Sequence, residues 1–302
     1  MELSVVVSTL NGREQLLSCL DTLSAHVPSS TELIVVNGPS SDGTTGAVRE
    51  REDVDVLVEI SERNRNVSRN AGIEVTSGEM IAFVGDTYLV TDSWYDAIET
   101  AADAGVDVVT GPADRKLSPE TKRPPTLRGG PVTEFDGDNV AFSRPLLEEL
   151  DGFDERLPVD GARDVAHRLA ARERSVTWSP EMAAREVVET DGGSPASDPD
   201  TASDPGERYR ARAYCLAKNY GPHPVVLGKP LYTALRDGLE RTRAVLGGEE
   251  TPTGWLGGGV TVSTSTLCGL KTGFVARYRE GRNPAGLSSR HDRAVRVYDR
   301  RE

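Results

Sequence analysis

Residues 3–9 are Leu-Ser-Val-Val-Val-Ser-Thr, and this stretch decides the fold. So short a run rich in valine predicts a strand that is buried on both faces, as strands of parallel sheets are. Asn11 follows as an expected helix N-cap, and leucines recur after it at helical spacing, at positions 16, 17, 20 and 23. The N-terminal segment therefore predicts a buried strand that leads directly into a helix.

The same alternation continues along the chain. Further strands are expected at residues 32–36, 54–59, 80–84, 106–110, 140–142 and 176–178, and helices at 68–76, 94–104, 145–150 and 164–172. Strands and helices that alternate at these lengths predict an α/β domain with a doubly wound sheet. Ligands of such sheets bind beyond the carboxyl ends of the strands, where Asn37, Gly85 and Asp86 fall.

Charge and cysteine content indicate the kind of organism and the cellular compartment of the protein. The 302-residue chain has a net charge of −13, and only five of its 35 basic residues are lysine. Acid excess with little lysine is typical of proteins dissolved in molar salt, where the Debye length falls to about 3 Å, so we expect a halophile; an ordinary acidic protein is the alternative. The three cysteines lie far apart in the sequence, which predicts a reducing, cytoplasmic location.

The two ends of the chain differ in charge and in pattern. We expect an α/β domain at residues 1–190, a linker at 191–205 and a basic helical region at 206–302. Residues 1–204 carry a net charge of −21 and residues 205–302 a net charge of +8. No stretch reaches the ~18 apolar residues of a spanning helix. The basic region predicts either an appendage packed on the α/β domain or peripheral membrane attachment, with residues 260–275 as an interfacial face.

Several motifs follow one another in the α/β domain. Residues 35–44 are Val-Val-Asn-Gly-Pro-Ser-Ser-Asp-Gly-Thr, and residues 68–73 are Ser-Arg-Asn-Ala-Gly-Ile. Residues 81–87 are Ile-Ala-Phe-Val-Gly-Asp-Thr, with the only acid of that turn at Asp86. Gly-Phe-Asp-Glu stands at 152–155, and Asp-Val-Ala-His-Arg-Leu at 164–169. Each motif alone is weak, but the ordered set is specific.

In this order the motifs resemble those of family 2 glycosyltransferases, which are inverting enzymes with the GT-A fold. The resemblance extends over about residues 3–182 and includes the opening strand, which in the family usually ends Pro-Thr-Tyr-Asn. It implies a GT-A domain, a Rossmann-like mixed sheet with flanking helices, to which the basic helical region is appended. It also implies a nucleotide-sugar donor, most simply a UDP-linked one.

The resemblance assigns nucleotide contacts to three residues. Thr9 offers a hydroxyl and backbone groups at the end of the first strand. Asn37 stands where the family has an aspartate that accepts the uracil N–H, and its carbonyl oxygen can accept the same bond. Arg69 is expected near the base or the diphosphate, with a surface salt bridge as the alternative, and Asn70 fixes the local turn.

The turn at Asp86 corresponds to the acidic metal-binding turn of the family, which often has two or three acids. A divalent cation neutralises the diphosphate leaving group as a Lewis acid, and hard cations prefer oxygen ligands. The resemblance therefore implies Mn²⁺ or Mg²⁺ held by Asp86, and a turn cap is the alternative role. Glu134, Asp136 and Asp138 lie in the region that usually binds sugar and acceptor, or form part of a halophilic surface.

An inverting transfer needs a general base for the acceptor hydroxyl. The family places it in a Glu-Asp pair just before the helix at 164–172, where this chain has Gly161 and Ala162. Asp164, the only acid inside the helix-start motif, is then the expected base, and the alternatives are that Asp160 serves instead or that the activity is altered. Asp164 at a helix N-terminus should have a lowered pKa, and a cap is its structural alternative.

The resemblance thus implies a hexosyltransferase that transfers a hexose or hexuronic acid to a lipid-linked or protein-linked glycan. If the source is haloarchaeal, the resemblance suggests N-glycan assembly for surface-layer glycoprotein on a polyprenyl-phosphate carrier, at the cytoplasmic face of the membrane. No nucleic-acid partner is expected. A non-catalytic relative that binds nucleotide sugar or glycan is the alternative, which Gly85, Thr87 and Ala162 favour. A nucleotidyltransferase would need a Gly-rich basic signature after the first strand, and residues 9–13 lack one.

Overall fold

The computed structural model describes residues 1–113, 120–122, 132–187, 205–224, 226, 228, 252–281 and 283–301. The chain divides into two compact units. The first contains Met1–Lys122, Gly130–Ala196 and Ala285–Glu302, and the second contains Arg123–Gly129 and Ser197–Pro284. The predicted linker at 191–205 lies outside the described residues, apart from Pro205, which begins a helix.

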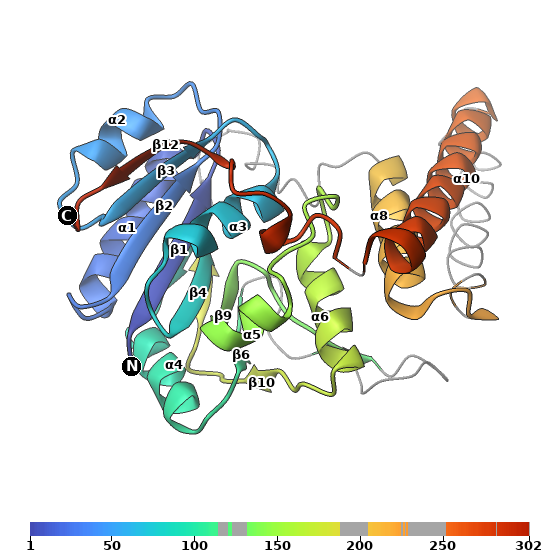
Figure 1. Cartoon of the computed structure of the whole chain (residues 1–302). Coiled ribbons are helices and arrows are strands. Elements are labelled where there is room, and N and C mark those ends of the chain that lie inside the picture. Colours follow the sequence, from blue (N-terminus) through green and yellow to red (C-terminus); the bar gives the residue numbers. More distant parts are fainter. Residues whose placement is uncertain are drawn as a thin grey trace. The chain divides into compact units, whose positions relative to one another are not determined.

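Eight strands of the described chain form the central sheet of the first unit, in the order β10-β6-β9-β4-β1-β2-β3-β12 (Figure 1). Six of them, β1 included, run in the same direction, while β9 and β12 run antiparallel to their neighbours. Their bounds are β1 Leu3–Thr9, β2 Glu32–Asn37, β3 Val56–Ile60, β4 Met80–Gly85, β6 Val108–Thr110, β9 Asn139–Ser143, β10 Thr177–Trp178 and β12 Ala294–Asp299. The mixed sheet confirms the predicted fold class. Two short ribbons pair β5 (Tyr88–Val90) with β11 (Ala184–Glu186) and β7 (Glu120–Lys122) with β8 (Val132–Glu134).

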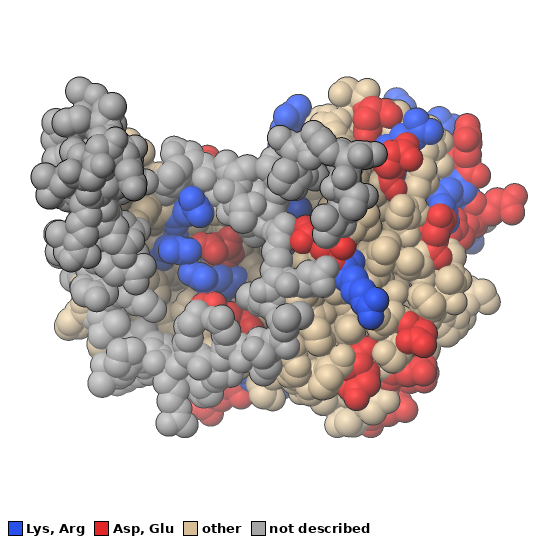
Figure 2. Space-filling view, turned by 180° about the vertical axis from the view of Figure 1, so that it is seen from behind, with Lys and Arg blue, Asp and Glu red and all other residues tan. Residues whose placement is uncertain are grey.

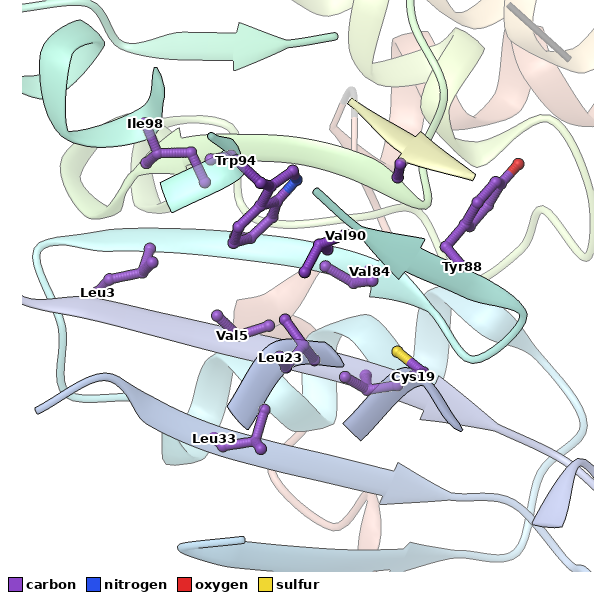
Figure 3. Close-up of a cluster of buried hydrophobic side chains, with 14 of the residues drawn as sticks. Leu3, Val5, Cys19, Leu23, Leu33, Val84, Tyr88, Val90, Trp94 and Ile98 are labelled. Carbon is purple, nitrogen blue, oxygen red and sulfur yellow. The ribbon is translucent and has the colours of Figure 1, made fainter. Parts of the chain in front are cut away.

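Helices cover both faces of the sheet, because alternate residues of each central strand point to opposite sides. Val5 and Val7 belong to the core under α1 (Arg13–His26), α2 (Thr44–Arg49) and α4 (Trp94–Asp103). Val6 belongs to the core under α3 (Arg65–Val75), α5 (Arg144–Glu149) and α6 (Gly161–Ala171). Figure 3 shows the first core, where Cys19 and Leu23 of α1 lie over strand residues such as Val5 and Val84. Trp94 is fully buried there.

Asn11 does not cap α1. Its backbone is left-handed, with φ of 52°, and the helix begins after Gly12 without a side-chain cap. The Asn11 carboxamide oxygen instead accepts the backbone N–H of Ser41 at 2.8 Å, which joins the loop after β1 to the loop after β2. The predicted cap is therefore a loop clamp at the edge of the sheet.

The last residues of the chain return to the sheet. The sequence pattern placed 294–299 in a helical region, but these residues form β12, which pairs antiparallel with β3. Arg293, just before this strand, is fully buried and binds the carboxylates of Glu155 and Glu74. Part of the basic charge at the end of the chain is thus neutralised within the acidic first unit.

The second unit contains α8 (Pro205–Tyr220) and α10 (Pro252–Val275), followed by one π-helical turn at Ala276–Glu280. The two helices pack closely at Gly273, which has no side chain. A Cβ at this position would lie only 2.6 Å from the carbonyl oxygen of Tyr214. Among the described residues, no helix is long and apolar enough to cross a membrane.

Arg293 should contribute more to stability than any exposed arginine of the tail. Arg293→Ala removes a buried guanidinium from Glu74 and Glu155, of which Glu155 keeps Arg290, and this should cost about 3 kcal/mol of unfolding free energy. Arg296→Ala is the matched control, because the Arg296 side chain is 66% exposed and only 4.0 Å from Glu59; its cost should stay below about 1 kcal/mol. Equal denaturant midpoints for the two variants would contradict this role of Arg293.

Candidate active site

The predicted nucleotide residues meet at one edge of the sheet. Thr9 pairs in register with Asn37, and Asn37 with Glu59, across three parallel strands. On the other side of β1, Ser8 pairs with Gly85, so that Asp86 follows directly beyond the edge. The structure therefore brings Thr9, Asn37 and Asp86 to neighbouring strand ends, which is where ligands of doubly wound sheets bind.

Asn37 is held in a fixed orientation. It is buried, its amide Nδ2 donates to Thr45 Oγ1 at 3.0 Å, and its Oδ1 accepts the Ser40 hydroxyl at 2.7 Å. The Thr45 hydroxyl donates in turn to Glu59 at 2.8 Å. A carboxamide oxygen has two lone pairs, so Oδ1 keeps one for a further donor such as the ring N–H of a base. This lone pair is the acceptor that the role predicted for Asn37 requires, and because Asn37 is only 1% exposed, a base must come directly against the strand edge to reach it.

Asp86 is a nearly buried carboxylate at the end of β4. Burial raises its pKa to about 6, and the nearby Asp138 carboxylate also raises it, while the Thr9 hydroxyl and the charge of Arg65 lower it. The Thr9 hydroxyl lies beside Asp86 and lowers its pKa as a hydrogen-bond donor does. This contact does not meet the geometry of a full hydrogen bond, and no other described group pairs with the buried Thr9 Oγ1. A Cβ at Gly12 would lie 2.6 Å from Asp86 Oδ2, so a side chain at position 12 would displace this carboxylate from its present position.

Two arginines converge on Asp138 beside this turn. Arg69 Nη2 donates to Asp138 Oδ1 at 2.7 Å, and Arg65 Nη1 binds the other oxygen, Oδ2. Arg69 is buried and its guanidinium lies 5.1 Å from the ring centroid of Phe153, whereas the Arg65 side chain is 31% exposed. Neither Arg65 nor this use of Asp138 was predicted. The sequence signal that could have indicated a joint role is their spacing, because residues 65 and 69 lie one turn apart on the same helix.

The Gly-Phe-Asp-Glu motif is a turn clamped by the asparagines of α3. Asn70 Oδ1 accepts the N–H of Phe153 at 2.8 Å, and its Nδ2 donates to Phe153 O and to Glu155 Oε1. Asn66 donates to the carbonyl oxygens of Asp154 and Leu157. Asn70 was expected to fix its local turn, but its side chain instead holds a turn that lies far away in the sequence. The same helix that carries Arg65 and Arg69 is thereby held in place.

The two candidate bases differ in environment. Asp164 is completely buried, and its Oδ2 accepts from Arg168 Nε at 2.9 Å. Arg168 is itself buried and donates to the carbonyls of Leu150 and Gly152. A carboxylate so enclosed has the geometry of a structural ion pair, and an acceptor hydroxyl could not reach it without opening the α6 packing.

Asp160 lies at the start of α6, nearer the charged cluster. Its backbone is left-handed, with φ of 61°, and its side chain is 21% exposed, 3.7 Å from Arg163. Two residues on, the side chain of Ala162 lies against Gly137, which also adjoins Arg69. The start of α6 thus borders the cluster of Arg69 and Asp138, and Asp160 is the more accessible of the two carboxylates.

The residues at the turn fit a divalent cation that is shared with phosphate oxygens. No group of three or more His, Cys, Asp or Glu side chains suited to a metal occurs in the part of the chain that the structure describes. Asp86, Asp138 and the unpartnered hydroxyl of Thr9 nevertheless supply oxygen donors, which Mn²⁺ and Mg²⁺ prefer. Mg²⁺ is often bound by one or two carboxylates together with substrate phosphates.

The sequence profile named Glycosyl transferase family 2 matches residues 4–153, about half the chain. The chain belongs to glycosyltransferase family 2. Glycosyltransferase AglE of Haloferax volcanii is 29% identical over 115 residues, which cover 36% of this chain and 38% of that protein. The putative glycosyltransferase EpsH of Bacillus subtilis is 30% identical over 104 residues, which cover 33% and 30%. The chain spans about a third of the length of the curated relatives it matches.

Solved glycosyltransferases share the fold of this family 2 member. Mannosyltransferase PcManGT from Pyrobaculum calidifontis, in complex with GDP-Man and Mn²⁺, superposes with a TM-score of 0.56 at 22% identity, covering 92% of this chain and 87% of that one. TarS 1-349 of S. aureus in complex with UDP superposes with a TM-score of 0.57 at 14% identity, covering 91% of each chain. At these identities the likeness establishes the GT-A fold alone.

Proposed function

We propose that this chain transfers a hexose or hexuronic acid from a nucleotide-sugar donor, most simply UDP-linked, to a glycan acceptor with inversion. The observation that carries the proposal is the position of Asp86 beside the unpartnered Thr9 hydroxyl, at the strand edge that also presents Asn37. A nucleotide placed along this edge would lay its base at Asn37 and its diphosphate at Asp86. Family membership supports a transferase over other nucleotide-binding enzymes.

The charged groups of the site suit a diphosphate leaving group. Mn²⁺ or Mg²⁺, held by Asp86, would neutralise the charge that develops on the diphosphate. Arg65 and Arg69 lie next to this turn and can contribute charge-assisted hydrogen bonds to phosphate oxygens. Asn37 orients the base through its carboxamide oxygen. Asn37 thus orients the donor, whereas the positive charges of Arg65, Arg69 and the cation would stabilise the leaving group.

We assign the general base to Asp160 and a structural role to Asp164. The base must reach the acceptor hydroxyl, and Asp160 is partly exposed at the helix start that borders the charged cluster. Asp164 is enclosed with Arg168. This departs from the expectation that Asp164 is the base, because helical periodicity alone did not reveal that position 164 faces inward.

The proposed acceptor is a polyprenyl-phosphate-linked glycan at the cytoplasmic face of the membrane, with N-glycan assembly for a surface layer as the setting. The similarity to AglE of Haloferax volcanii and the lysine-poor acidic composition support a haloarchaeal source. Peripheral contact through residues 260–275 fits the 66% exposure of Leu267 on α10.

Asp86→Ala should abolish sugar transfer and leave the fold intact. The test is a screen of UDP- and GDP-sugars for binding, in high salt, with Mn²⁺ or with EDTA. Mn²⁺-dependent binding of one donor by the wild type, lost in Asp86→Ala at unchanged circular dichroism, supports the proposal. Mn²⁺-dependent binding without donor hydrolysis or transfer would instead identify a non-catalytic relative.

Asn substitutions should separate the two candidate bases. Asp160→Asn removes basicity at an accessible position, so kcat should fall by about 10²–10⁴ with donor binding and stability nearly unchanged. Asp164→Asn breaks a buried ion pair, so the free energy of unfolding should fall by about 3 kcal/mol. A stable Asp164→Asn variant with the larger loss in kcat would reverse the assignment.

A further inference from the structure

At the end of β4, position 85 is a glycine, and the side chain of Asp138 from the segment before β9 lies beside it. Gly85 has no side chain, and a Cβ built there would lie 2.8 Å from Tyr88 Cδ2, 3.0 Å from Asp138 Cβ and 3.3 Å from Asp138 Cγ. The Gly85 N–H also donates to the Asp138 carbonyl at 3.0 Å. The Tyr88 ring and the Asp138 side chain therefore share the space into which a side chain at position 85 would project, directly before Asp86, and Asp138 is the acid of the two.

A second observation points to a ligand beside these acids. Thr9 is 5% exposed, and its hydroxyl has no hydrogen-bond partner among the described residues. Viewed from Gly12, the Thr9 Oγ1 and the Asp86 Oδ2 lie on the same side, 3.1 Å and 2.6 Å from the position of a Cβ there. Leaving a buried hydroxyl without a partner costs about 1–3 kcal/mol, so this hydroxyl is placed for a group that is not part of the protein.

The Asp138 carboxylate is held in position by α3. Arg65 binds one of its oxygens and Arg69 the other, and the Asp138 side chain is 17% exposed. The backbone N–H of Asp138 donates to Asp136 Oδ1 at 2.9 Å, which fixes the chain where β9 begins. Asp138 is thus an ordered carboxylate between two arginines and the turn of Asp86.

We propose that Asp138 is the second acidic ligand of the divalent cation bound at Asp86, in place of the acidic side chain that position 85 lacks. This rests on the proposed function, because the cation is the one shared with the donor diphosphate. Two carboxylates give an oxygen-rich, doubly negative site of the kind that Mn²⁺ and Mg²⁺ prefer. The Thr9 hydroxyl completes the set of protein oxygens.

Arg65 and Arg69 make metal and nucleotide binding depend on each other. Without donor, their guanidinium groups are engaged by Asp138. A diphosphate offers both arginines new acceptors, and the Asp138 carboxylate then becomes available to the cation. Coupling of this kind is reciprocal, so Mn²⁺ should strengthen nucleotide binding by the same factor as nucleotide strengthens Mn²⁺ binding.

The test compares wild type with Asp138→Asn, Asp86→Asn and the control Glu134→Gln. Glu134 is an acid of the same region whose carboxylate lies 3.6 Å from Arg163. Calorimetry would measure the affinity for UDP and for GDP, with saturating Mn²⁺ and with EDTA, and electron paramagnetic resonance would measure bound Mn²⁺ directly. Asp138→Ser serves as a second variant if Asp138→Asn does not fold.

We expect the enhancement by Mn²⁺ to fall at least about tenfold in Asp138→Asn and in Asp86→Asn, and to persist in Glu134→Gln. In EDTA, Asp138→Asn should bind the nucleotide at least as tightly as wild type, because its arginines are no longer engaged by a charge. Unchanged Mn²⁺ dependence in Asp138→Asn or Asp138→Ser overturns the inference while the proposed function stands. If wild type binds neither nucleotide with Mn²⁺, the proposed function fails as well.

Discussion

The candidate site depends on the register in which β1 pairs with β2 on one side and β4 on the other. That register places Thr9 opposite Asn37 and Ser8 opposite Gly85, the residue before Asp86. The hydroxyl of Thr9, the carboxamide of Asn37 and the carboxylate of Asp86 therefore reach the same edge of the sheet. Side chains alternate between the two faces of a sheet, and a slip of one residue would move the apolar set of β1 to the wrong core. The two cores under the helices therefore fix the geometry of the site, although none of its polar groups belongs to them.

Helix α3 connects this edge with the rest of the first unit. Its arginines Arg65 and Arg69 face the acidic turn, while Asn66 and Asn70 hold the turn at residues 152–157. Glu155 of that turn binds Arg290 and Arg293 from the end of the chain. The end of the chain thus supports α3 indirectly, because Arg290 and Arg293 hold Glu155 and the turn of Glu155 is held by α3. Acidic and basic side chains also lie next to each other on the described surface, as Figure 2 shows.

Much of this arrangement could be predicted from local sequence. Apolar runs predicted the parallel strands, and the position of Asp86 after one of them placed it correctly at the sheet edge. The pairing of Arg65 with Asp138 was not accessible, because these residues are 73 positions apart and only the folded sheet brings them together. The burial of Asp164 was missed because a polar residue on a helix gives no sign that a partner four residues later encloses it. β12 was missed because its arginines and exposed valines lack the pattern of a buried strand.

The central claim is that the cation and the donor diphosphate meet at the end of β4, between Asp86 and Asp138. Crystals grown with Mn²⁺ and the nucleotide that the protein binds would test it directly through anomalous diffraction from manganese. The account predicts an anomalous peak in contact with both carboxylates and with phosphate oxygens, and Arg65 and Arg69 turned toward the diphosphate. A nucleotide bound at Asn37 with manganese absent from this turn, or bound elsewhere on the chain, would contradict it.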